Sequence, residues 1–388
     1  LAAAPRRPVL GLAAAAALLL VPPQDLGMSP FKDLPAAPDK RVLETRHGPM
    51  GRVDLVAVPS MHHAPGLSLM APALPANQDA LYLDGHFVTA VDRGDTAYLD
   101  HTVDALPFVV RGTRARIALL GVGPGLSRAT RVVDPNPDLL ALAGVPGEAM
   151  VPGSWVVAGE SGWNLLLHSV PALHAAAETP LLTVEGLRAA FEVAPVAIQC
   201  AVETPPRAAL KLLATADRVT PDVVAVRSAD RLSVLLLRAP PTDHDRERVQ
   251  AWCRDNGFDP VRPAAWRFPR PFHETDFPLD PPGPGYPYDV EPATDARPYF
   301  FKFFRWDRAG AVFDRDHTAF VQWPFVAMAV AFAQVTLLGL LLLAAPLAFS
   351  RAARAPAALF VALGLGFMLL EMAFLQRAMM RLGGPVAA

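Results

Sequence analysis

The sequence predicts an α/β fold, in which a small β unit precedes an open sheet flanked by helices and two transmembrane helices follow. Three observations support this prediction. Strand-like runs alternate with helical patterns between Ile117 and Asn256. Before these elements, an Asp-Gly pair joins two runs in which apolar and polar residues alternate. Two long apolar runs, Val321–Phe349 and Ala355–Leu375, lie near the other end.

Composition limits the partners and the organisation of the chain. Its 388 residues leave room for two or three structural units. The net charge of −2 provides no basic surface, so we expect no nucleic-acid partner. Cys200 and Cys253 are far apart and favour two buried thiols, with a disulfide as the alternative. We expect four segments: 1–24 as the end of an N-terminal membrane helix or a signal-like segment, 25–110 as the β unit with a lead-in helix, 111–318 as the α/β domain, and 319–388 as a transmembrane hairpin.

The two apolar runs predict a helical hairpin in a membrane. Each reaches the roughly 20 residues that a spanning helix needs, and Arg351 and Arg354 lie between them. We therefore expect an integral membrane protein, in the bacterial inner membrane, with the lipid bilayer as a partner. Arg351 and Arg354 in the loop place the polar domain outside the cytoplasm, whereas the basic residues before the hairpin, between Lys302 and Arg315, favour the opposite side, so the side of the domain stays open. Glu371, inside the second run, is expected to pair with neighbouring polar side chains rather than to form an ion path.

The β unit is predicted from alternating runs of apolar and polar residues. Arg52–Val58 and Ala80–Val91 have this pattern, and Asp84-Gly85 predicts a hairpin turn within the second run. Tyr98–Val110 then predicts a helix that leads into the strand at Ile117.

The elements of the α/β domain follow in order after a second short strand, Arg131–Val133. We expect a strand at Trp155–Ala158, a helix at Thr183–Phe191, a strand at Val196–Cys200, a helix at Pro206–Asp217, strands at Val223–Arg227 and Leu232–Leu237, a helix at Asp243–Asn256, and a proline-rich loop over Arg262–Pro292.

A glycine-rich turn provides the main sign of a binding site. Gly121, Gly123 and Gly125 follow an apolar strand, and Asp134 ends the next strand. Glycines allow the backbone to approach a nucleotide-like ligand, and an acidic side chain at this position can accept hydrogen bonds from ribose hydroxyls. Glycine turns also follow strands for steric reasons alone. Only eight residues separate Gly125 from Asp134, too few for the helix that usually joins parallel strands.

Seven blocks of sequence occur in an order typical of one family. They are SPFKDL (Ser29–Leu34), HHAPGLSL (His62–Leu69), LYLDG (Leu81–Gly85), TAYLDHTVDALPF (Thr96–Phe108), LLTVEGLRAAF (Leu181–Phe191), PATDARPYFFKFFRW (Pro292–Trp306) and LLEMAFLQR (Leu369–Arg377). In these blocks the chain resembles membrane-embedded spermidine synthase-like proteins. That family is related to the aminopropyltransferases and belongs to the wider S-adenosylmethionine-dependent methyltransferase superfamily.

The resemblance implies a Rossmann-like S-adenosylmethionine-dependent methyltransferase domain with a small N-terminal β unit and C-terminal transmembrane helices. It implies that Gly121, Gly123 and Gly125 line the amino-acid and ribose portion of S-adenosylmethionine or decarboxylated S-adenosylmethionine. Asp134 would hold the ribose hydroxyls, and Glu160 would lie beside the adenine amino group.

On the substrate side, the resemblance places Asp84 and Tyr98 at the lip of a pocket for a polyamine or another small amine. From the residues alone, Asp84 is a turn former and Tyr98 packs on the sheet, so both interpretations stay open.

The chain departs from the family where a catalytic base is expected. Leu165–Glu178 matches an Asp-rich loop but contains no Asp, and the strand that normally precedes that loop is expected to be missing. His168 and His174 are expected to be structural, and His62-His63 has no third ligand at metal spacing, so we predict no metal and name no catalytic residue.

Two functions from different classes remain. The first is a membrane-anchored transferase that moves an aminopropyl or methyl group from an S-adenosyl cofactor to an amine. The second is a catalytically inactive relative with a degenerate site that acts as a membrane-bound sensor or scaffold. The sequence leaves homo-oligomer formation open.

Overall fold

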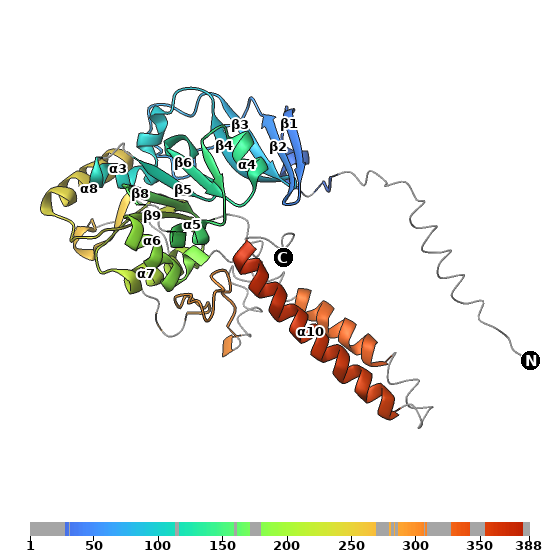
Figure 1. Ribbon diagram of the computed structural model, residues 1–388. Helices are drawn as coiled ribbons and strands as arrows, with labels where there is room; N and C mark the ends of the chain where they lie inside the picture. The colour runs from blue at the N-terminus through green and yellow to red at the C-terminus, as the bar shows by residue number, and fades with distance from the viewer. Residues whose placement is uncertain are drawn as a thin grey trace, which may run out of the picture.

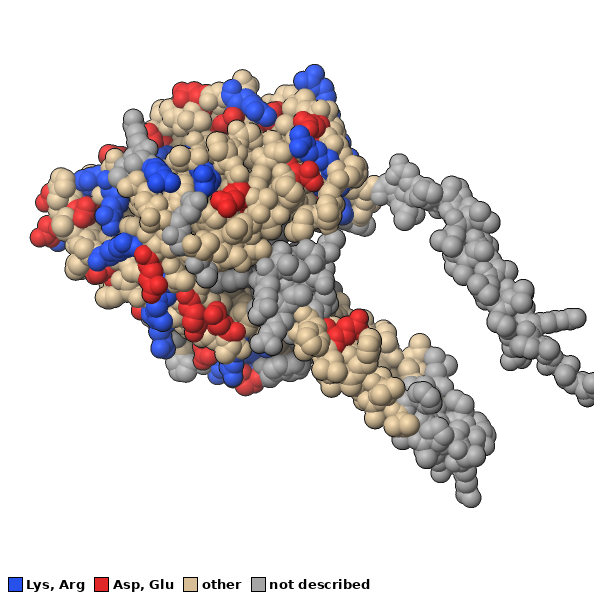
Figure 2. Space-filling model, in the orientation of Figure 1, with Lys and Arg blue, Asp and Glu red and all other residues tan. Residues whose placement is uncertain are grey.

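The computed structural model describes residues 28–30, 32–112, 116–158, 161–170, 180–268, 279–280, 283, 286–305, 307–308, 327–341 and 354–382. Two sheets form the main body, and two helices extend away from it (Figure 1). Acidic and basic side chains are interspersed over the face of this body that Figure 2 shows.

The first sheet is antiparallel, with the order β1-β2-β3-β4. The short helix α2 (Asp33–Ala36) precedes it, and its strands are β1 (Arg41–Gly48), β2 (Gly51–Ala57), β3 (Gln78–Leu83) and β4 (His86–Asp92). The predicted hairpin turn is confirmed, because Asp84 and Gly85 have φ angles of 50° and 80°. The Asp-Gly pair suits this turn, since both of its central residues need positive φ.

The second sheet has eight strands in the order β12-β10-β11-β9-β8-β5-β6-β7. Strands β7, β6, β5, β8 and β9 are parallel, and β11, β10 and β12 complete the sheet in antiparallel pairing. The strands are β5 (Ile117–Leu120), β6 (Arg131–Asp134), β7 (Gly147–Ala149), β8 (Leu165–Ser169), β9 (Val196–Ala201), β10 (Val223–Arg227), β11 (Arg231–Leu236) and β12 (Asp259–Arg262). This topology confirms the predicted α/β class and is consistent with a Rossmann-like domain.

Helices cover both faces of the second sheet. They are α3 (Leu106–Arg111), α4 (Pro137–Ala143), α5 (Pro152–Ala158), α6 (Val184–Val193), α7 (Ala208–Val219) and α8 (Asp243–Asn256). One apolar cluster packs α5, α6 and α7 on one face and includes Trp155. The other contains Leu106, Leu139 and Val249 of α3, α4 and α8, together with Leu81 of the first sheet. The first sheet therefore shares a core with one face of the second.

The connection between β5 and β6 is unusually short. A single 3₁₀ turn, η3 (Leu126–Arg128), replaces the helix that such crossovers usually contain. The two strands are nevertheless parallel neighbours, and the Gly121 N–H donates to the carbonyl of Val133 at 2.8 Å. The inference that eight residues leave no room for a full helix is confirmed.

Two elements differ from the predictions because local patterns were ambiguous. The predicted strand at Trp155–Ala158 is wrong: these residues end α5, which begins at Pro152. Short apolar runs do not distinguish a strand from a buried helix, and proline is favoured in the first helical turn. The predicted helix over Tyr98–Val110 is divided into η1 (Ala97–His101), η2 (Val103–Ala105) and α3, because Thr102 is extended and Pro107 lies in the first turn of α3.

The first part of the stretch matched to the Asp-rich loop, Leu165–Ser169, is a strand and not a loop. This strand, β8, pairs in parallel with both β5 and β9, so a strand is present where one was expected to be missing. Its apolar run, Leu165–Leu167, is buried on both sides, as in other central parallel strands. The loop that follows lies mostly outside the described residues, as does His174.

The predicted membrane location is wrong. Residues 327–341 are helical, and the residues directly before and after them lie outside the described range. Helix α10 (Arg354–Leu382) follows. Across the part of the chain that the structure describes, no helix combines the length and the apolar character needed to cross a membrane. This finding overturns the integral-membrane localisation; residues 1–24 lie outside the described range.

Candidate functional site

A small cavity lies where the two sheets meet. We call it the inner cavity; among its lining residues are His63, Gln78, Asp92, Tyr98, Gly125 and Arg128. The volume open to the centres of water-sized molecules is about 40 Å³, room for roughly three waters. Its wall combines polar and apolar side chains, and it brings β3, β4 and η1 next to the glycine turn that follows β5.

The Asp92 carboxylate is the central polar group of this cavity. Gln78 Nε2 and Tyr98 Oη each donate to its Oδ1 at 2.9 Å, and Ser127 Oγ donates to Oδ2. All three donors are neutral. Among the residues that the structure describes, no Lys or Arg forms an ion pair with Asp92; the neighbouring Arg93 pairs with Asp79 instead. Among the described residues, the carboxylate therefore lies beside the cavity without a cationic partner.

Two further side chains have pKa values altered by this environment. Burial, followed by the charge of Asp92, raises the pKa of Tyr98, which therefore stays a neutral hydrogen-bond donor. Burial, followed by the charge of Arg231, lowers the pKa of His63 below its usual 6.5. His63 is accordingly a neutral imidazole at pH 7 and can accept a proton.

A buried ion pair supports the inner cavity. Arg231 Nε lies 3.0 Å and 2.9 Å from the two carboxylate oxygens of Asp104, and both side chains are almost fully buried. The same guanidinium donates to Ser169 Oγ at 2.9 Å and to Gln199 Oε1 at 3.4 Å. These bonds tie η2 to the carboxyl end of β8 and to β9 and β11, which holds the second sheet in place under the cavity.

The glycine turn and Asp134 lie at the carboxyl ends of β5 and β6, as predicted. Gly121 and Gly125 have φ angles of 88° and 96°, which only glycine adopts without strain. Asp134 Oδ2 accepts from the Val122 N–H at 2.9 Å, and Oδ1 accepts from the Asn136 N–H at 2.8 Å. Burial raises the pKa of Asp134, and these two backbone hydrogen bonds oppose the rise.

The residues present fit the glycine and ribose contacts of an adenosyl group. A Cβ placed on Gly121 would meet no heavy atom within 4 Å, so the turn leaves space beside its backbone. Each oxygen of Asp134 accepts one backbone N–H and, having two lone pairs, can accept another donor. Glu160, predicted to contact adenine, lies outside the described residues.

The other predicted site residues are not gathered in one place. Tyr98 lines the inner cavity, whereas Asp84 is exposed at the far turn of the β3–β4 hairpin and accepts the Arg52 N–H at 2.9 Å. His168 is buried in β8, with Nδ1 2.6 Å from the Leu120 carbonyl oxygen. Burial lowers its pKa, and its Nε2 has no hydrogen-bond partner in the described residues. The described residues contain no group of three His, Cys, Asp or Glu side chains that could hold a metal.

Sequence reasoning missed Asp92, Gln78 and Arg128, and considered His63 only as a metal ligand. One signal was available: Asp92 is an acidic residue that ends an alternating strand, directly before the block that contains Tyr98. The other three residues come from separate parts of the chain, and only the tertiary structure brings them together.

The chain is similar in structure to several spermidine synthases. They are a probable spermidine synthase from Corynebacterium glutamicum (13% identity, 55% of this chain and 87% of that one, TM-score 0.40), the spermidine synthase from Thermotoga maritima (13%, 55% and 78%, 0.36), and a spermidine synthase in complex with the transition state analogue AdoDATO (12%, 55% and 79%, 0.34). No protein-family model and no curated protein matches the sequence. Because all three TM-scores are below 0.5, the assignment of function depends on the geometry of the site.

Proposed function

We propose that this protein is a transferase that moves an aminopropyl or methyl group from an S-adenosyl cofactor to a small amine. The observation that carries the proposal is the Asp92 carboxylate, which has no cationic partner among the described residues and lies in a cavity bordered by Gly125 of the glycine turn. A partly buried carboxylate of this kind is suited to an ammonium group, since pairing offsets the cost of removing it from water.

The cofactor would lie along the glycine turn. Gly121 provides the open space beside the backbone, and Asp134 has one lone pair left on each oxygen for the ribose hydroxyls. When bound, an S-adenosyl cofactor supplies an alkyl carbon activated by its sulfonium. The family resemblance of the sequence blocks supports this choice of cofactor.

The amine would lie in the inner cavity. Asp92 pairs with its ammonium group, while Tyr98 and Gln78 keep the carboxylate oriented through their hydrogen bonds. His63, a neutral base at pH 7 in the same cavity, is placed to accept the proton that the amine loses on becoming a nucleophile. This assignment replaces the aspartate base that Leu165–Glu178 lacks.

The test is a product assay on the full chain with decarboxylated S-adenosylmethionine and putrescine, and with S-adenosylmethionine in parallel. Mass spectrometry should detect the elongated or methylated amine together with the thioether left by the cofactor. Asp92→Asn should lower kcat/KM for the amine at least about tenfold, because a partly buried charge pair is lost. Asp255→Asn, an exposed site on α8, is the matched control. Absence of product with both cofactors, or equal rates in the two variants, would overturn the proposal.

A second candidate is a non-catalytic protein that retains the fold. It is favoured by the hydrogen bonds that Asp134 already accepts from Val122 and Asn136, which stabilise the turn without any ligand. Calorimetry with S-adenosylmethionine and its decarboxylated form distinguishes the two candidates. Micromolar binding that Asp134→Asn weakens and Asp255→Asn preserves supports the transferase; no binding by the folded chain supports the non-catalytic protein.

A further inference from the structure

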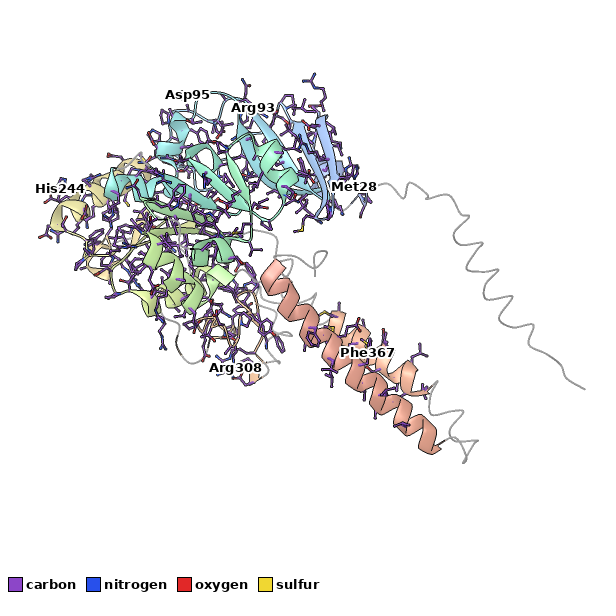
Figure 3. The ribbon with its side chains drawn as sticks, in the orientation of Figure 1. Met28, Arg93, Asp95, His244, Arg308 and Phe367 are labelled. Atoms are coloured by element: carbon purple, nitrogen blue, oxygen red, sulfur yellow. The ribbon has the colours of Figure 1, made fainter. Side chains whose placement is uncertain are left out.

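An open groove lies beside the inner cavity. We call it the outer groove; it runs between η1, α3 and α8 and has a volume of about 680 Å³. Asp95 and Asp100 supply carboxylates to its wall, and Phe108 and Trp252 supply aromatic rings. Figure 3 places Asp95 at the surface close to Arg93, so this end of the groove is open to solvent. Its volume lies within the range of about 300–1,000 Å³ that is typical of small-molecule sites.

The outer groove and the inner cavity share one wall. Leu99, Ser127 and Arg128 line both spaces, so their side chains form the partition between them. The inner cavity alone, at about 40 Å³, is too small for even a short diamine. A ligand that reaches Asp92 from the groove must therefore displace part of this partition.

Arg128 is the long, charged member of the partition, and its contacts lie on the groove side. Its Nη2 is 3.0 Å from Asp100 Oδ1, and its guanidinium lies 4.3 Å from the centre of the Phe108 ring. The Asp100 side chain is 73% exposed, whereas that of Arg128 is 14% exposed. Neither contact is strong, because water screens an exposed ion pair and a single cation–π contact contributes little more.

We propose that Arg128 is a gate between the outer groove and the inner cavity, and that a small primary amine opens it by taking the place of its guanidinium against Asp100 and Phe108. The identity of the ligand rests on the proposed function. The gate itself rests only on the shared wall and on the contacts of Arg128.

The chemistry of the groove supports an amine as the opening ligand. An ammonium group can form the same two contacts that the guanidinium forms, one with the Asp100 carboxylate and one with the face of Phe108. Asp95 and Trp252 add a second carboxylate and a second ring to the same wall. The displaced Arg128 moves toward water, which relieves the burial that lowers its pKa.

The gate can be tested by the reactivity of a cysteine placed inside the cavity. Thr89 lines the inner cavity, is 2% exposed and is close to cysteine in size. In the full chain with Thr89→Cys, the rate of labelling by aminoethyl methanethiosulfonate is followed by mass spectrometry. Adding Arg128→Ala should raise this rate about fivefold to tenfold, the factor expected from losing one exposed ion pair and one cation–π contact. Cys200 and Cys253, both fully buried, are internal references in the same spectra.

Two further variants separate the gate from general loosening of the fold. Arg111→Ala removes an exposed arginine on α3 that lines neither space, and should leave the labelling rate unchanged. Asp100→Asn keeps Arg128 but weakens its anchor, and should give an intermediate rate. If the introduced cysteine is labelled at the same rate with Arg128→Ala and with Arg111→Ala, the gate is overturned. The gate is also overturned if Arg128→Ala speeds the labelling of Cys200 and Cys253 as much as that of the introduced cysteine.

The ligand is tested separately with putrescine by calorimetry. Arg128→Ala should tighten binding because no side chain has to be displaced, and Asp100→Asn should weaken it about fivefold to tenfold. If the wild type binds putrescine and neither variant changes the Kd, the displacement of Arg128 by the amine is overturned. If the wild type binds no amine while the labelling rates still differ, the proposed function fails and the gate stands.

Discussion

Tyr98 Oη lies 2.9 Å from Asp92 Oδ1 and donates a hydrogen bond to it at the junction of the two sheets. The two residues are separated by the loop that leads from β4 into η1, so this bond fixes the start of the linker between the sheets. Because Gln78 of β3 donates to the same oxygen, the hydrogen bond also connects the linker to the interior of the first sheet.

Removing the Tyr98 hydroxyl should destabilise the protein. Tyr98→Phe leaves Asp92 with two donors, and loss of a hydrogen bond to a charged group is expected to lower the free energy of unfolding by about 1.5 kcal/mol. Urea denaturation followed by circular dichroism measures the change. Tyr82→Phe is the control, because Tyr82 is equally buried and its hydroxyl has no hydrogen bond within the described residues. If Tyr98→Phe lowered the free energy of unfolding no more than Tyr82→Phe does, the role assigned to Tyr98 would be contradicted.

The Asp104–Arg231 pair should be the costliest single contact to break. Asp104→Ala leaves a buried guanidinium without its counterion and is expected to cost about 3–5 kcal/mol. Replacing both residues, by Asp104→Leu and Arg231→Met, should recover most of this loss, since two apolar side chains remove both buried charges. For comparison, Glu44→Ala in the exposed Glu44–Arg46 pair should cost under about 1 kcal/mol. If Asp104→Ala and Glu44→Ala lowered the free energy of unfolding by similar amounts, this interpretation would be ruled out.

His63 should set the acid side of the rate profile if the transferase is active. Its pKa is lowered below 6.5, so it binds a proton only at acidic pH, and the protonated form cannot accept the proton of the amine. We expect kcat/KM to be constant near pH 7 and to fall as the pH drops through the lowered pKa. His63→Asn should lower the plateau and abolish this acid limb. If His63→Asn kept the wild-type pH profile of kcat/KM, the acid limb would have to be assigned to another group.

The elements predicted correctly have strong local signals. The hairpin at Asp84-Gly85 was predicted from two residues, and the helix Asp243–Asn256 has the predicted boundaries. In α8 the signals are a capping box between Thr242 and Asp245 and a left-handed Gly257 at the other end. Such elements are encoded by neighbouring residues and do not depend on the rest of the fold.

The elements predicted wrongly depend on distant contacts. Trp155 contacts Trp163 in the core on one face of the sheet, with ring centres 5.6 Å apart, and this packing selects a helix over a strand. The site was predicted only in part for the same reason. Asp104 and Arg231 are 127 positions apart, so no local pattern reveals their pairing. Tyr98 and the glycine turn could be found because motifs surround them, whereas Asp92 and His63 acquire a role only from the cavity.

Stability should fall in mild acid because of His168. Its pKa is lowered in the folded state, so between the usual value of 6.5 and the lowered value the unfolded chain binds more protons. The free energy of unfolding therefore decreases as the pH drops below about 6.5, by at most about 1.4 kcal/mol per pH unit for this one proton. His168→Asn should reduce the slope of this dependence in denaturation curves taken from pH 8 to 5; His63, whose pKa is also lowered, contributes in the same direction and stays in the variant. An unchanged slope in His168→Asn would exclude this histidine as the source.

Gly121 and Gly144 form a matched pair that separates cofactor binding from backbone strain. Their φ angles are 88° and 72°, and a Cβ on either would meet no heavy atom within 4 Å. Gly121→Ala and Gly144→Ala should therefore cost a similar amount of stability, about 1–2 kcal/mol, from the left-handed conformation alone. Only Gly121→Ala places a methyl group in the space proposed for the adenosyl group. It should weaken binding of S-adenosylmethionine at least about tenfold in calorimetry, as expected for one extra methyl in a filled site. Equal binding by the two variants would place the cofactor elsewhere, because Gly144 ends α4 and contributes nothing to the glycine turn.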